Sequence, residues 1–447
     1  MKMEDIRYSV VIGAYETNQL FFKQVLESVY RIGWRNMEIQ VMDACPHAGI
    51  EAAAYQVCGE DYRLHYHKVH RAASMGSVWN EGVRVSRGDY LIFLGSTDCL
   101  HPGMLQYLTR AIKEDPDADI IYTDHDEIHD EARMNPHFVP GPNLELLRHT
   151  NYIGETFTVR RELFAAIGRF KEKLSFAFAY DFLLRAAISG RRLRHIPTLL
   201  WHRRIYNLPL DQAQIREALK KSMREHTVVS QASLHLQGIP AVVKADVSGE
   251  YWHVEYDGSD FGAHHRDVIV LKEEGVRPLG KKIQERLYAY VKQPDVAIAG
   301  GRFLRGFGTT VDNCGLICDK DGITYPVCHG QSVFSQGLYR RMVIPQDVIA
   351  VDDGYCMIDA KFFKRCGGFD RNLTGRDRML DLCLKARAGG MRVVYVPSAM
   401  AIRKNKELFS SQQSHERLVE RWQNTLREGD PFYNVNLPMG LDNYTLS

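Results

Sequence analysis

Acidic residues follow three predicted strands in the first part of the chain: Asp43 after one, Asp98 after the next, and Asp124 with Asp126 after a third. The carboxyl ends of strands in an open α/β sheet border a crevice where ligands bind, so these acids are candidates for one polar site. Carboxylates there could accept the hydroxyl and ring N–H groups of a nucleotide, hold a divalent ion, or take a proton from an attacking hydroxyl. Any one of them alone is more often a turn residue or a helix cap, and it is their recurrence that favours a ligand site.

The elements that would position these acids alternate between strands and helices. Apolar strands at 8–15 and 37–42 flank a helix whose apolar face runs from Phe22 to Tyr30, which predicts a right-handed βαβ unit. The apolar run at 90–94 predicts a strand buried on both faces of a parallel sheet. The predicted fold class is therefore α/β. No GxGxxG follows the first strand, which disfavours a dinucleotide-dependent oxidoreductase.

The overall charge does not indicate a nucleic-acid partner, because 57 Lys and Arg stand against 55 Asp and Glu for a net charge of +2. Basic residues are instead concentrated in one segment, 185–204. Its members are Arg185, Arg191, Arg192, Arg194, His195, His202, Arg203 and Arg204. This segment is either a solvated face or an anion site for a diphosphate.

The cellular setting is expected to be cytoplasmic. No apolar run reaches the roughly 18 residues that a membrane helix needs, and the first five residues lead into a strand rather than a secretory leader. The 9 cysteines, scattered singly, favour reduced thiols over a disulfide framework. Cys314, Cys318, Cys328 and His329 could be drawn as a zinc site, but their spacing matches no familiar ligand pattern, and ordinary buried residues are favoured.

A series of motifs runs through the first half of the chain. They are Ser9-Val-Val-Ile-Gly-Ala-Tyr-Glu16, Glu38-Ile-Gln-Val-Met-Asp43, Gly88-Asp-Tyr-Leu-Ile-Phe-Leu94, Ile121-Tyr-Thr-Asp-His-Asp-Glu-Ile128, Asn151-Tyr-Ile-Gly154, Val159-Arg-Arg-Glu-Leu163, Tyr180-Asp-Phe-Leu-Leu-Arg185 and His195-Ile-Pro-Thr-Leu-Leu-Trp-His202. This succession resembles the family 2 glycosyltransferases, which have the GT-A fold and transfer a sugar from a nucleotide-sugar to an acceptor hydroxyl. It looks most like the tandem, rhamnosyltransferase-like branch that builds envelope polysaccharides.

The resemblance implies roles for particular residues. The donor would be bound by Tyr15, Glu16, Asp43, Asp98, His202 and Arg203. Candidates for proton transfer are Asp181, Asp124 and Asp126, and a divalent Mg²⁺ or Mn²⁺ would be held by Asp98. The implied partners are a nucleotide-sugar and a glycan or lipid-linked acceptor, with peripheral contact at the inner face of a membrane.

A second, shorter copy of the same motifs follows. Its pieces are Asp295-Val-Ala-Ile-Ala-Gly-Gly301, Gly367-Gly-Phe-Asp370, Asp381-Leu-Cys-Leu-Lys385, Met391-Arg-Val-Val-Tyr-Val-Pro397 and Asp430-Pro-Phe-Tyr-Asn434. The nucleotide-binding βαβ half that the family places before these pieces is missing. The expected organisation is a transferase-like domain at 1–208, a connector at 209–265 and a partial GT-A-like α/β domain at 266–447 that is structural or faces the acceptor.

The chain departs from the family pattern at its chemical positions. Thr97 stands where a metal-holding aspartate is usual, and a neutral hydroxyl is a poor ligand for Mg²⁺ or Mn²⁺. Ala179 stands where inverting members carry the catalytic base, and Met379 takes that place in the second copy. Asp181 could replace the base, or it could be a helix residue that pairs with Arg185 at i+4.

Two hypotheses follow from these observations. The first is an active glycosyltransferase in which His202, with Arg203 and Arg204, neutralises the departing diphosphate; His202 could equally be a packed histidine. The second is a catalytically inactive scaffold of the same fold that supports an active partner, as the loss of the base in both copies suggests. The family resemblance favours the enzyme.

Overall fold

The structure is a computed structural model that describes residues 6–15, 17–47, 49–130, 132–206, 211–403, 410–440 and 444–445. The chain forms two compact units. The first comprises residues 1–139, 151–233 and 245–252, and the second comprises 140–150, 234–244 and 253–447. Both are built of sheets with packed helices, so the predicted α/β class is confirmed.

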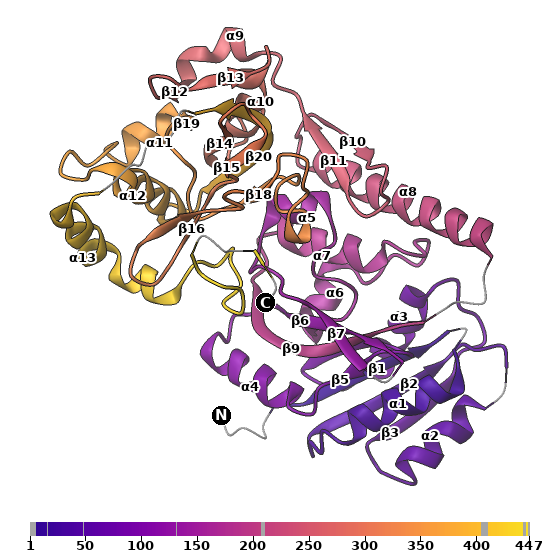
Figure 1. Cartoon of the computed structure of the whole chain (residues 1–447). Coiled ribbons are helices and arrows are strands. Elements are labelled where there is room, and N and C mark those ends of the chain that lie inside the picture. The colour runs from indigo at the N-terminus through magenta and orange to yellow at the C-terminus, as the bar shows by residue number, and fades with distance from the viewer. Residues whose placement is uncertain are drawn as a thin grey trace. The chain divides into compact units, whose positions relative to one another are not determined.

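The first unit contains a nine-stranded mixed sheet in the order β3-β2-β1-β4-β8-β6-β9-β5, with β7 beside β6 (Figure 1). Its strands are β1 (Tyr8–Ala14), β2 (Met37–Asp43), β3 (Leu64–Lys68), β4 (Tyr90–Gly95), β5 (Cys99–Leu100), β6 (Ile120–His129), β7 (Ala132–His137), β8 (Thr158–Arg160) and β9 (Leu193–Ile205). Its helices are α1 (Gln19–Tyr30), α2 (Ile50–Cys58), α3 (Met75–Val85), α4 (Met104–Glu114), α6 (Arg161–Ile167) and α7 (Phe178–Ile188).

The strands β2, β1 and β4 run parallel and end at a common edge. Ala14 of β1 pairs with Asp43 of β2, and Gly13 of β1 pairs with Gly95 of β4. All residues of β1 and β2 are buried, as expected for strands covered on both faces, although β2 alternates and buries the polar Glu38 and Gln40 as well. The sheet therefore delivers the segments after β1, β2 and β4 to one edge.

Helices cover both faces of this sheet. On one face, α1, α2 and α4 pack Phe22, Ile50 and Leu105 into a core with the side chains of β1 and β2. On the other face, Trp79 of α3 lies against Phe93 of β4, with ring centroids 5.2 Å apart, and aromatic residues of α6 and α7 complete the cluster. These two cores hold the strand ends in fixed positions.

Strand β6 is longer than the sequence predicts. It continues to His129, so that Asp124 and Asp126 lie within the strand rather than after it. The reason is non-local: β6 runs parallel to β9, and the pairing extends to His129 opposite Ile205. The polar residues that seemed to end the strand are stabilised by partners on β9.

The second unit contains a seven-stranded sheet in the order β12-β19-β14-β20-β13, with β15 beside β14 and β18 beside β20. Its strands are β12 (Val268–Lys272), β13 (Arg277–Leu279), β14 (Val296–Arg305), β15 (Thr310–Asn313), β18 (Gln346–Asp347), β19 (Tyr355–Asp359) and β20 (Arg392–Ile402). Two small sheets join β10 (Ala241–Ala245) to β11 (Trp252–Tyr256) and β16 (Leu316–Cys318) to β17 (Thr324–Pro326).

The remaining helices are α5 (Leu144–His149), α8 (Gln212–Leu236), α9 (Phe261–His264), α10 (Ile283–Val291), α11 (Ala360–Arg365), α12 (Gly375–Ala388) and α13 (Gln412–Glu428), with short 3₁₀ turns η1 (His265–Asp267) and η2 (Leu338–Arg340). Most of α8 belongs to the first unit, and the others belong to the second. Leu287 of α10 packs into a core with Ala299 of β14 and Val394 of β20. No helix in the described part of the chain combines the length and apolar character needed to cross a membrane.

The second sheet repeats the pairing scheme of the later half of the first. Strand β14 is parallel to β20 and antiparallel to β19, as β6 is parallel to β9 and antiparallel to β8. Strands β12 and β13 pair antiparallel with β19 and β20, as β4 and β5 do with β8 and β9. Among the described strands of the second sheet, none takes the places that β1, β2 and β3 take in the first.

Candidate functional site

Asp43 lies at the end of β2, buried and hydrogen-bonded on both carboxylate oxygens. Oδ2 accepts from the Tyr66 hydroxyl at 2.7 Å and from Lys68 Nζ at 3.0 Å, and Oδ1 accepts from the Cys45 amide at 2.9 Å. Both side-chain donors come from β3, because the parallel register places Lys68 opposite Asp43. These contacts fix the position of the carboxylate at the strand end.

The segment after β1 meets the segment after β4. The Thr17 hydroxyl lies 2.5 Å from the Ser96 hydroxyl, within reach of a hydrogen bond, and also donates to the Tyr15 carbonyl at 3.4 Å. Tyr15, expected to contact the donor, is half-buried in this loop. Glu16, the other residue expected there, lies outside the described residues.

Asp98 occupies the loop between β4 and β5 and contacts the end of β9. Its Oδ2 accepts from Trp201 Nε1 at 3.0 Å and its Oδ1 from the Arg204 amide at 3.2 Å. Burial raises the pKa of Asp98, while these two hydrogen bonds act against that shift. The pairing of β5 with β9 brings Asp98 beside Trp201, His202 and Arg204.

The acids of β6 hold the histidines of β9. Asp126 Oδ1 lies 2.6 Å from His202 Nδ1, and Arg133 Nη2 donates to Asp126 Oδ2 at 2.6 Å. Burial works to raise the pKa of Asp126, but the hydrogen bonds from His202 and Arg133 outweigh it and lower the pKa. Asp124, fully buried, lies 2.8 Å from His195 Nε2. An ionised Asp126 orients the His202 ring with Nδ1 toward the carboxylate and leaves Nε2 on the opposite side.

Most of the basic segment is neutralised by acids or by carbonyl groups. Arg192 and Arg194 pair with Asp115 and Glu114 at 2.8 and 2.5 Å. The buried Arg204 guanidinium donates to the carbonyls of Thr97 and Asp130 and to the Gln24 side chain. Arg204 is therefore a positioning residue of the loop rather than a cation turned to a ligand.

Arg203 differs from its neighbour Arg204. It is exposed, and the described residues give its guanidinium no hydrogen-bond or ion-pair partner. Its charge acts on Asp98 and on Glu155, lowering the pKa of each against the larger effect of burial. At the end of β9, an anion site therefore has support at Arg203.

Glu155 is a residue that the sequence analysis did not select. It follows Gly154, which has a φ of +88° and a backbone amide that donates to Asn151 Oδ1 at 3.2 Å. A Cβ at position 154 would lie 3.1 Å from the Trp201 ring, so glycine is required on both counts and the turn packs on the indole that binds Asp98. The available signal was the motif Asn151-Tyr-Ile-Gly154 itself, which precedes this acid directly.

The environment of Glu155 suits proton transfer. The residue is exposed, and the described residues supply no hydrogen-bond or ion-pair partner for it. Surrounding protein nevertheless desolvates the carboxyl, and this effect, with the negative charge of Asp98, raises the pKa of Glu155 to about 7. An accessible carboxylate whose pKa is close to the working pH is well suited to general-base catalysis.

Asp181 lies in the first turn of α7 and is buried between two cations. Arg185 Nε donates to Oδ2 at 2.8 Å, which is the i+4 pair considered from the sequence, and Lys171 Nζ lies 2.5 Å from Oδ1. Ala179, at the position of the usual base, is fully buried. Neither side chain offers an accessible proton acceptor on this helix.

Asp43 and Asp98 lie on the same edge of the sheet with β1 between their strands. Two strand spacings separate β2 from β4, which is roughly 10 Å. The structure thus groups Asp98, Asp126, His202 and Arg203 around the end of β9, with Asp43 at the far side of β1. Asp181 contacts none of this group through the hydrogen bonds just described.

The residues present fit a divalent cation poorly. Both oxygens of Asp98 already accept hydrogen bonds, and Thr97 replaces the second carboxylate. In the described part of the chain, no three His, Cys, Asp or Glu side chains converge as a metal site. For the cysteine cluster considered from the sequence, His329 has both ring nitrogens engaged, by Arg305 Nη1 at 3.1 Å and by the Asp312 carbonyl at 2.8 Å.

The chain is thus an α/β protein whose candidate site lies at the sheet edge that carries these carboxylates, the histidine and the arginine. The sequence model described as Glycosyl transferase family 2 matches residues 9–168, which include β1, β2, β4 and β6. For this segment the match confirms the family resemblance predicted from the sequence, and the α/β class is confirmed for the first sheet.

The chain is also similar in sequence to two bacterial proteins. The uncharacterized protein y4gI of Sinorhizobium fredii is 23% identical over 545 residues, covering 98% of this chain and 58% of that protein. The O-antigen biosynthesis protein RfbC of Myxococcus xanthus is 27% identical over 198 residues, 44% of this chain and 16% of its own length. This chain therefore spans little more than half of the first relative and a small part of the second.

Among solved structures, the chain is similar to S. aureus TarS in complex with UDP-GlcNAc, with 14% identity, a TM-score of 0.41, and coverage of 50% of this chain and 66% of that one. A mannosyltransferase from Pyrobaculum calidifontis in complex with GDP-Man and Mn²⁺ gives 16% identity and a TM-score of 0.38 over 52% of this chain and 75% of the other. Likeness at this level carries no weight for the function of this chain.

Proposed function

We propose that this chain transfers a sugar from a nucleotide-sugar to the hydroxyl of a glycan or lipid-linked acceptor in the synthesis of an envelope polysaccharide. The observation that carries the proposal is the grouping of Asp98, His202, Arg203 and Glu155 at the same sheet edge as Asp43, within or beside the segment that matches family 2. The O-antigen role in the name of the M. xanthus relative supports the substrate class.

In this proposal each side chain has a role in binding or proton transfer. Asp43 Oδ1 accepts the ring N3–H of uracil or thymine, and Arg203 with His202 Nε2 faces the diphosphate. Glu155 takes the proton of the acceptor hydroxyl. At the same time the oxygen of that hydroxyl bonds to the anomeric carbon of the donor sugar, and the bond from that carbon to the diphosphate oxygen breaks. The negative charge that develops on the leaving diphosphate is stabilised by Arg203, and no step depends on a metal ion.

This assignment differs from the roles first considered for the acids. Asp124 and Asp126 act through His195 and His202, which they orient, and Asp181 maintains the fold of α7 through its two ion pairs. Of the carboxylates considered, Glu155 is the one placed to accept a proton without first losing an ion pair. Breaking such a pair inside a protein is strongly unfavourable.

Nucleotide binding tests the proposal directly. The purified full chain is titrated calorimetrically with UDP, thymidine diphosphate and GDP, each with and without Mg²⁺ or Mn²⁺. We expect saturable binding of a pyrimidine diphosphate that does not require the metal. Absence of binding to all of the nucleotides under both conditions would refute the proposed donor site.

A scaffold function is the second candidate, favoured by the buried Ala179 and by Thr97 in the place of a metal ligand. It predicts that no sugar is transferred even when nucleotide binds. Incubation of the chain with a radiolabelled donor and a membrane extract as acceptor separates the two candidates. A labelled product that disappears in the Glu155→Gln variant excludes the scaffold, whereas donor binding without product supports it.

The second unit is proposed to serve the acceptor side or the stability of the chain. Its sheet has the pairing scheme of the later half of the first sheet without counterparts of β1–β3, the strands that carry Asp43 and Lys68 in the first unit. A unit without those strands has no equivalent of the proposed base-binding pocket. If the acceptor is lipid-linked, the proposal also requires the protein to contact the membrane surface that holds this acceptor.

A further inference from the structure

A buried arginine of the second unit has no anionic partner. Arg302 on β14 is only 9% exposed, and its Nε and Nη1 atoms have no hydrogen-bond partner among the described residues. Its Nη2 points at Met400 Sδ, a weak acceptor, at 3.2 Å. A guanidinium is always charged in a protein, and burying it without an acceptor is costly, so this arrangement calls for an explanation.

A strand irregularity gives Arg302 its position. The pairing of β14 with β20 shifts between Gly301, opposite Val396, and Arg302, opposite Met400, so that residues 397–399 form a bulge. A Cβ at position 301 would come within 2.0 Å of the Ala399 carbonyl oxygen, so only glycine allows the bulge to approach this closely. Bulges commonly redirect side chains next to functional sites.

Arg302 lines a cavity of about 700 Å³ that is formed entirely by residues of the second unit. Its wall includes His149, Tyr256, Arg286 and Ser398 of the bulge. Arg286 Nη1 donates to the Ser398 carbonyl at 2.5 Å and so fastens the bulge to α10. The volume lies within the range of about 300–1,000 Å³ that is usual for small-molecule pockets.

The acids that line the cavity already have partners. Glu255 lies 2.5 Å from Lys244 Nζ, Glu285 lies 3.8 Å from Lys282 Nζ, and Asp257 accepts from the Ser259 amide at 2.9 Å. None of these contacts involves Arg302. These acids of the cavity wall therefore do not compensate the charge of Arg302.

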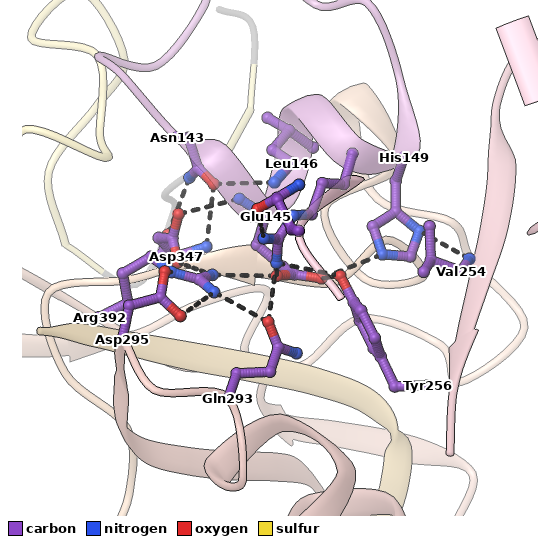
Figure 2. Close-up of polar contacts among 12 residues, drawn as sticks. Asn143, Glu145, Leu146, His149, Val254, Tyr256, Gln293, Asp295, Asp347 and Arg392 are labelled. Atoms are coloured by element: carbon purple, nitrogen blue, oxygen red, sulfur yellow. Dashed lines mark hydrogen bonds and ion pairs between the residues drawn. The ribbon is translucent and has the colours of Figure 1, made fainter. Parts of the chain in front are cut away.

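A buried hydrogen-bond network, drawn in Figure 2, includes two residues of the cavity wall, His149 and Tyr256. Glu145 Oε1 accepts from the Tyr256 hydroxyl at 2.7 Å and lies 3.3 Å from His149 Nε2. Arg392 Nη1 donates to Glu145 Oε2 at 2.9 Å and to Asp347 Oδ1 at 3.1 Å. Tyr256 and His149 thus reach the cavity from a network whose charges are compensated, in contrast to Arg302.

We propose that this cavity binds the oxyanion of a small polar ligand, a carboxylate or phosphate group of a sugar-sized molecule, which pairs with the Arg302 guanidinium. Charged guanidinium groups form strong hydrogen bonds with both kinds of oxyanion. Among the described residues, the Arg302 guanidinium has no acceptor stronger than the Met400 thioether. The proposal is independent of the donor site in the first unit, and either can fail without the other.

A thiol competes for the same charge. Burial works to raise the pKa of Cys314, but contacts with Cys328 and Tyr395, together with the charge of Arg302, lower it. If a thiolate at Cys314 were the counter-ion of Arg302, the Cys314→Ser variant would lose stability and the wild type would bind no oxyanion. The proposal instead expects this variant to bind oxyanions at least as tightly as the wild type.

The test is calorimetric titration of the full chain with glucuronate, glucose 6-phosphate, inorganic phosphate and neutral glucose. We expect saturable binding of glucuronate or of glucose 6-phosphate and none of glucose. The stronger of the two identifies the oxyanion, and binding of inorganic phosphate as tight as that of glucose 6-phosphate shows that the sugar contributes nothing. The Arg302→Met variant should lose at least about tenfold in affinity, which corresponds to about 1.4 kcal/mol.

Two further measurements keep the proposal open to refutation. Arg302→Met should melt at a higher temperature than the wild type without ligand, because an uncompensated buried charge is removed, and it should lose the ligand-induced rise in melting temperature. Arg302→Lys should bind with intermediate affinity, and Arg277→Met, at an exposed position of the same unit, should match the wild type. Absence of saturable binding of both charged sugars, or equal binding by Arg302→Met, would overturn the proposal.

Discussion

Corresponding strand ends in the two units each carry an arginine, but only the arginine of the second unit is paired with carboxylates among the described residues. In the first unit, Asp98 follows β4, and Arg203 on β9 is exposed without an ion-pair partner among the described residues. In the second unit, Glu273 follows β12, and Arg403 directly follows β20. Arg403 is buried and its guanidinium lies 2.8 Å from Asp352 Oδ1 and 2.5 Å from Asp312 Oδ2.

We interpret the strand end with Arg203 as a candidate ligand site and the ion-pair cluster around Arg403 as a structural feature, although both sheets share the same strand pairing. The carboxylates around Arg403 raise its pKa further, against the effect of burial, and its guanidinium also stacks over the Phe303 ring at 4.8 Å. Such a cation has nothing left to offer a ligand. Among the described residues, neither Arg203 nor Glu155 has a partner of this kind, so the charge of Arg203 and the acceptor oxygens of Glu155 stay available.

The comparison is tested most strongly at Glu155. The Glu155→Gln variant should lower the rate of nucleoside diphosphate release by about 10²–10⁴-fold, because the amide cannot accept the proton of the acceptor hydroxyl. The rate is measured with the nucleotide-sugar that binds in calorimetry. Donor affinity should stay close to that of the wild type.

The matched control for this variant is Glu162→Gln, an exposed glutamate in the first turn of α6. It should leave the rate unchanged. A Glu155→Gln enzyme as fast as the wild type would show that another group takes the proton.

In the second unit the corresponding change should affect stability. Asp352 accepts two bonds from Arg403 and one from the Gly354 amide, so Asp352→Asn leaves a buried cation with Asp312 as its main partner. We expect a loss of about 3 kcal/mol in the free energy of unfolding, measured by urea denaturation. Nucleotide affinity of the folded protein should not change.

Asp353 supplies the control for Asp352. Its ion pair with Arg378, at 2.8 Å, is considerably more exposed, and pairs of this kind contribute about 1 kcal/mol or less. Asp353→Asn should therefore be much less harmful than Asp352→Asn. Equal effects of the two variants would show that Arg403 does not depend on Asp352.

Asp43 tests whether the sheet edge of the first unit binds the nucleotide base. The Asp43→Ala variant should weaken UDP binding by about 10- to 100-fold, the range expected for loss of a hydrogen bond to a charged group. Binding of inorganic pyrophosphate should be unaffected, since it has no base. Asp61→Asn, which disturbs the ion pair of Asp61 with Arg63 before β3, serves as the control.

If UDP affinity survives Asp43→Ala, the base is bound elsewhere. If pyrophosphate binding is lost together with UDP binding, the variant has disturbed the whole edge of the sheet rather than the base contact alone. Asp43→Asn, which keeps an acceptor for the Tyr66 hydroxyl, then distinguishes the two effects.

The smallest expected effect is a pH dependence at Glu155. Its pKa rises from the ordinary value of 4.5 to about 7 on folding, so between these values the folded chain holds more protons at this position than the unfolded chain. Stability relative to Glu155→Gln should therefore fall as the pH rises from 4.5 to 7, while the transfer rate of the wild type should rise toward a plateau above pH 7. Melting temperatures and rates across this range provide the check.

The sequence predicted the strands of the first sheet well because their signals are local. Apolar runs defined β1 and β4, and the alternating segment Met37-Glu-Ile-Gln-Val-Met42 defined β2. These three strands set the edge that carries Asp43 and Asp98. The extent of β6 was not predicted, since the partners that keep Asp124 and Asp126 inside the strand belong to β9, some 70 residues further along the chain.

The chemical state of the candidate site could not be predicted in the same way. Arg203 and Arg204 are neighbours of the same type, yet one is exposed and the other is enclosed by Thr97, Asp130 and Gln24. Glu155 is a candidate residue because the turn that precedes it packs on Trp201, which donates a hydrogen bond to Asp98. In each case the deciding contact joins segments that are far apart in the sequence, and no local pattern encodes it.

The route of the chain between the two units limits how the protein can be dissected. The chain crosses from one unit to the other after residues 139, 150, 233, 244 and 252. A truncated fragment ending near residue 208 would retain α5 but expose Glu145 and Arg148, both almost fully buried in the intact chain, to water. Single-cut truncation or limited proteolysis is therefore unsuited to assigning activities to the halves, and point substitutions in the full-length polypeptide are the appropriate tool.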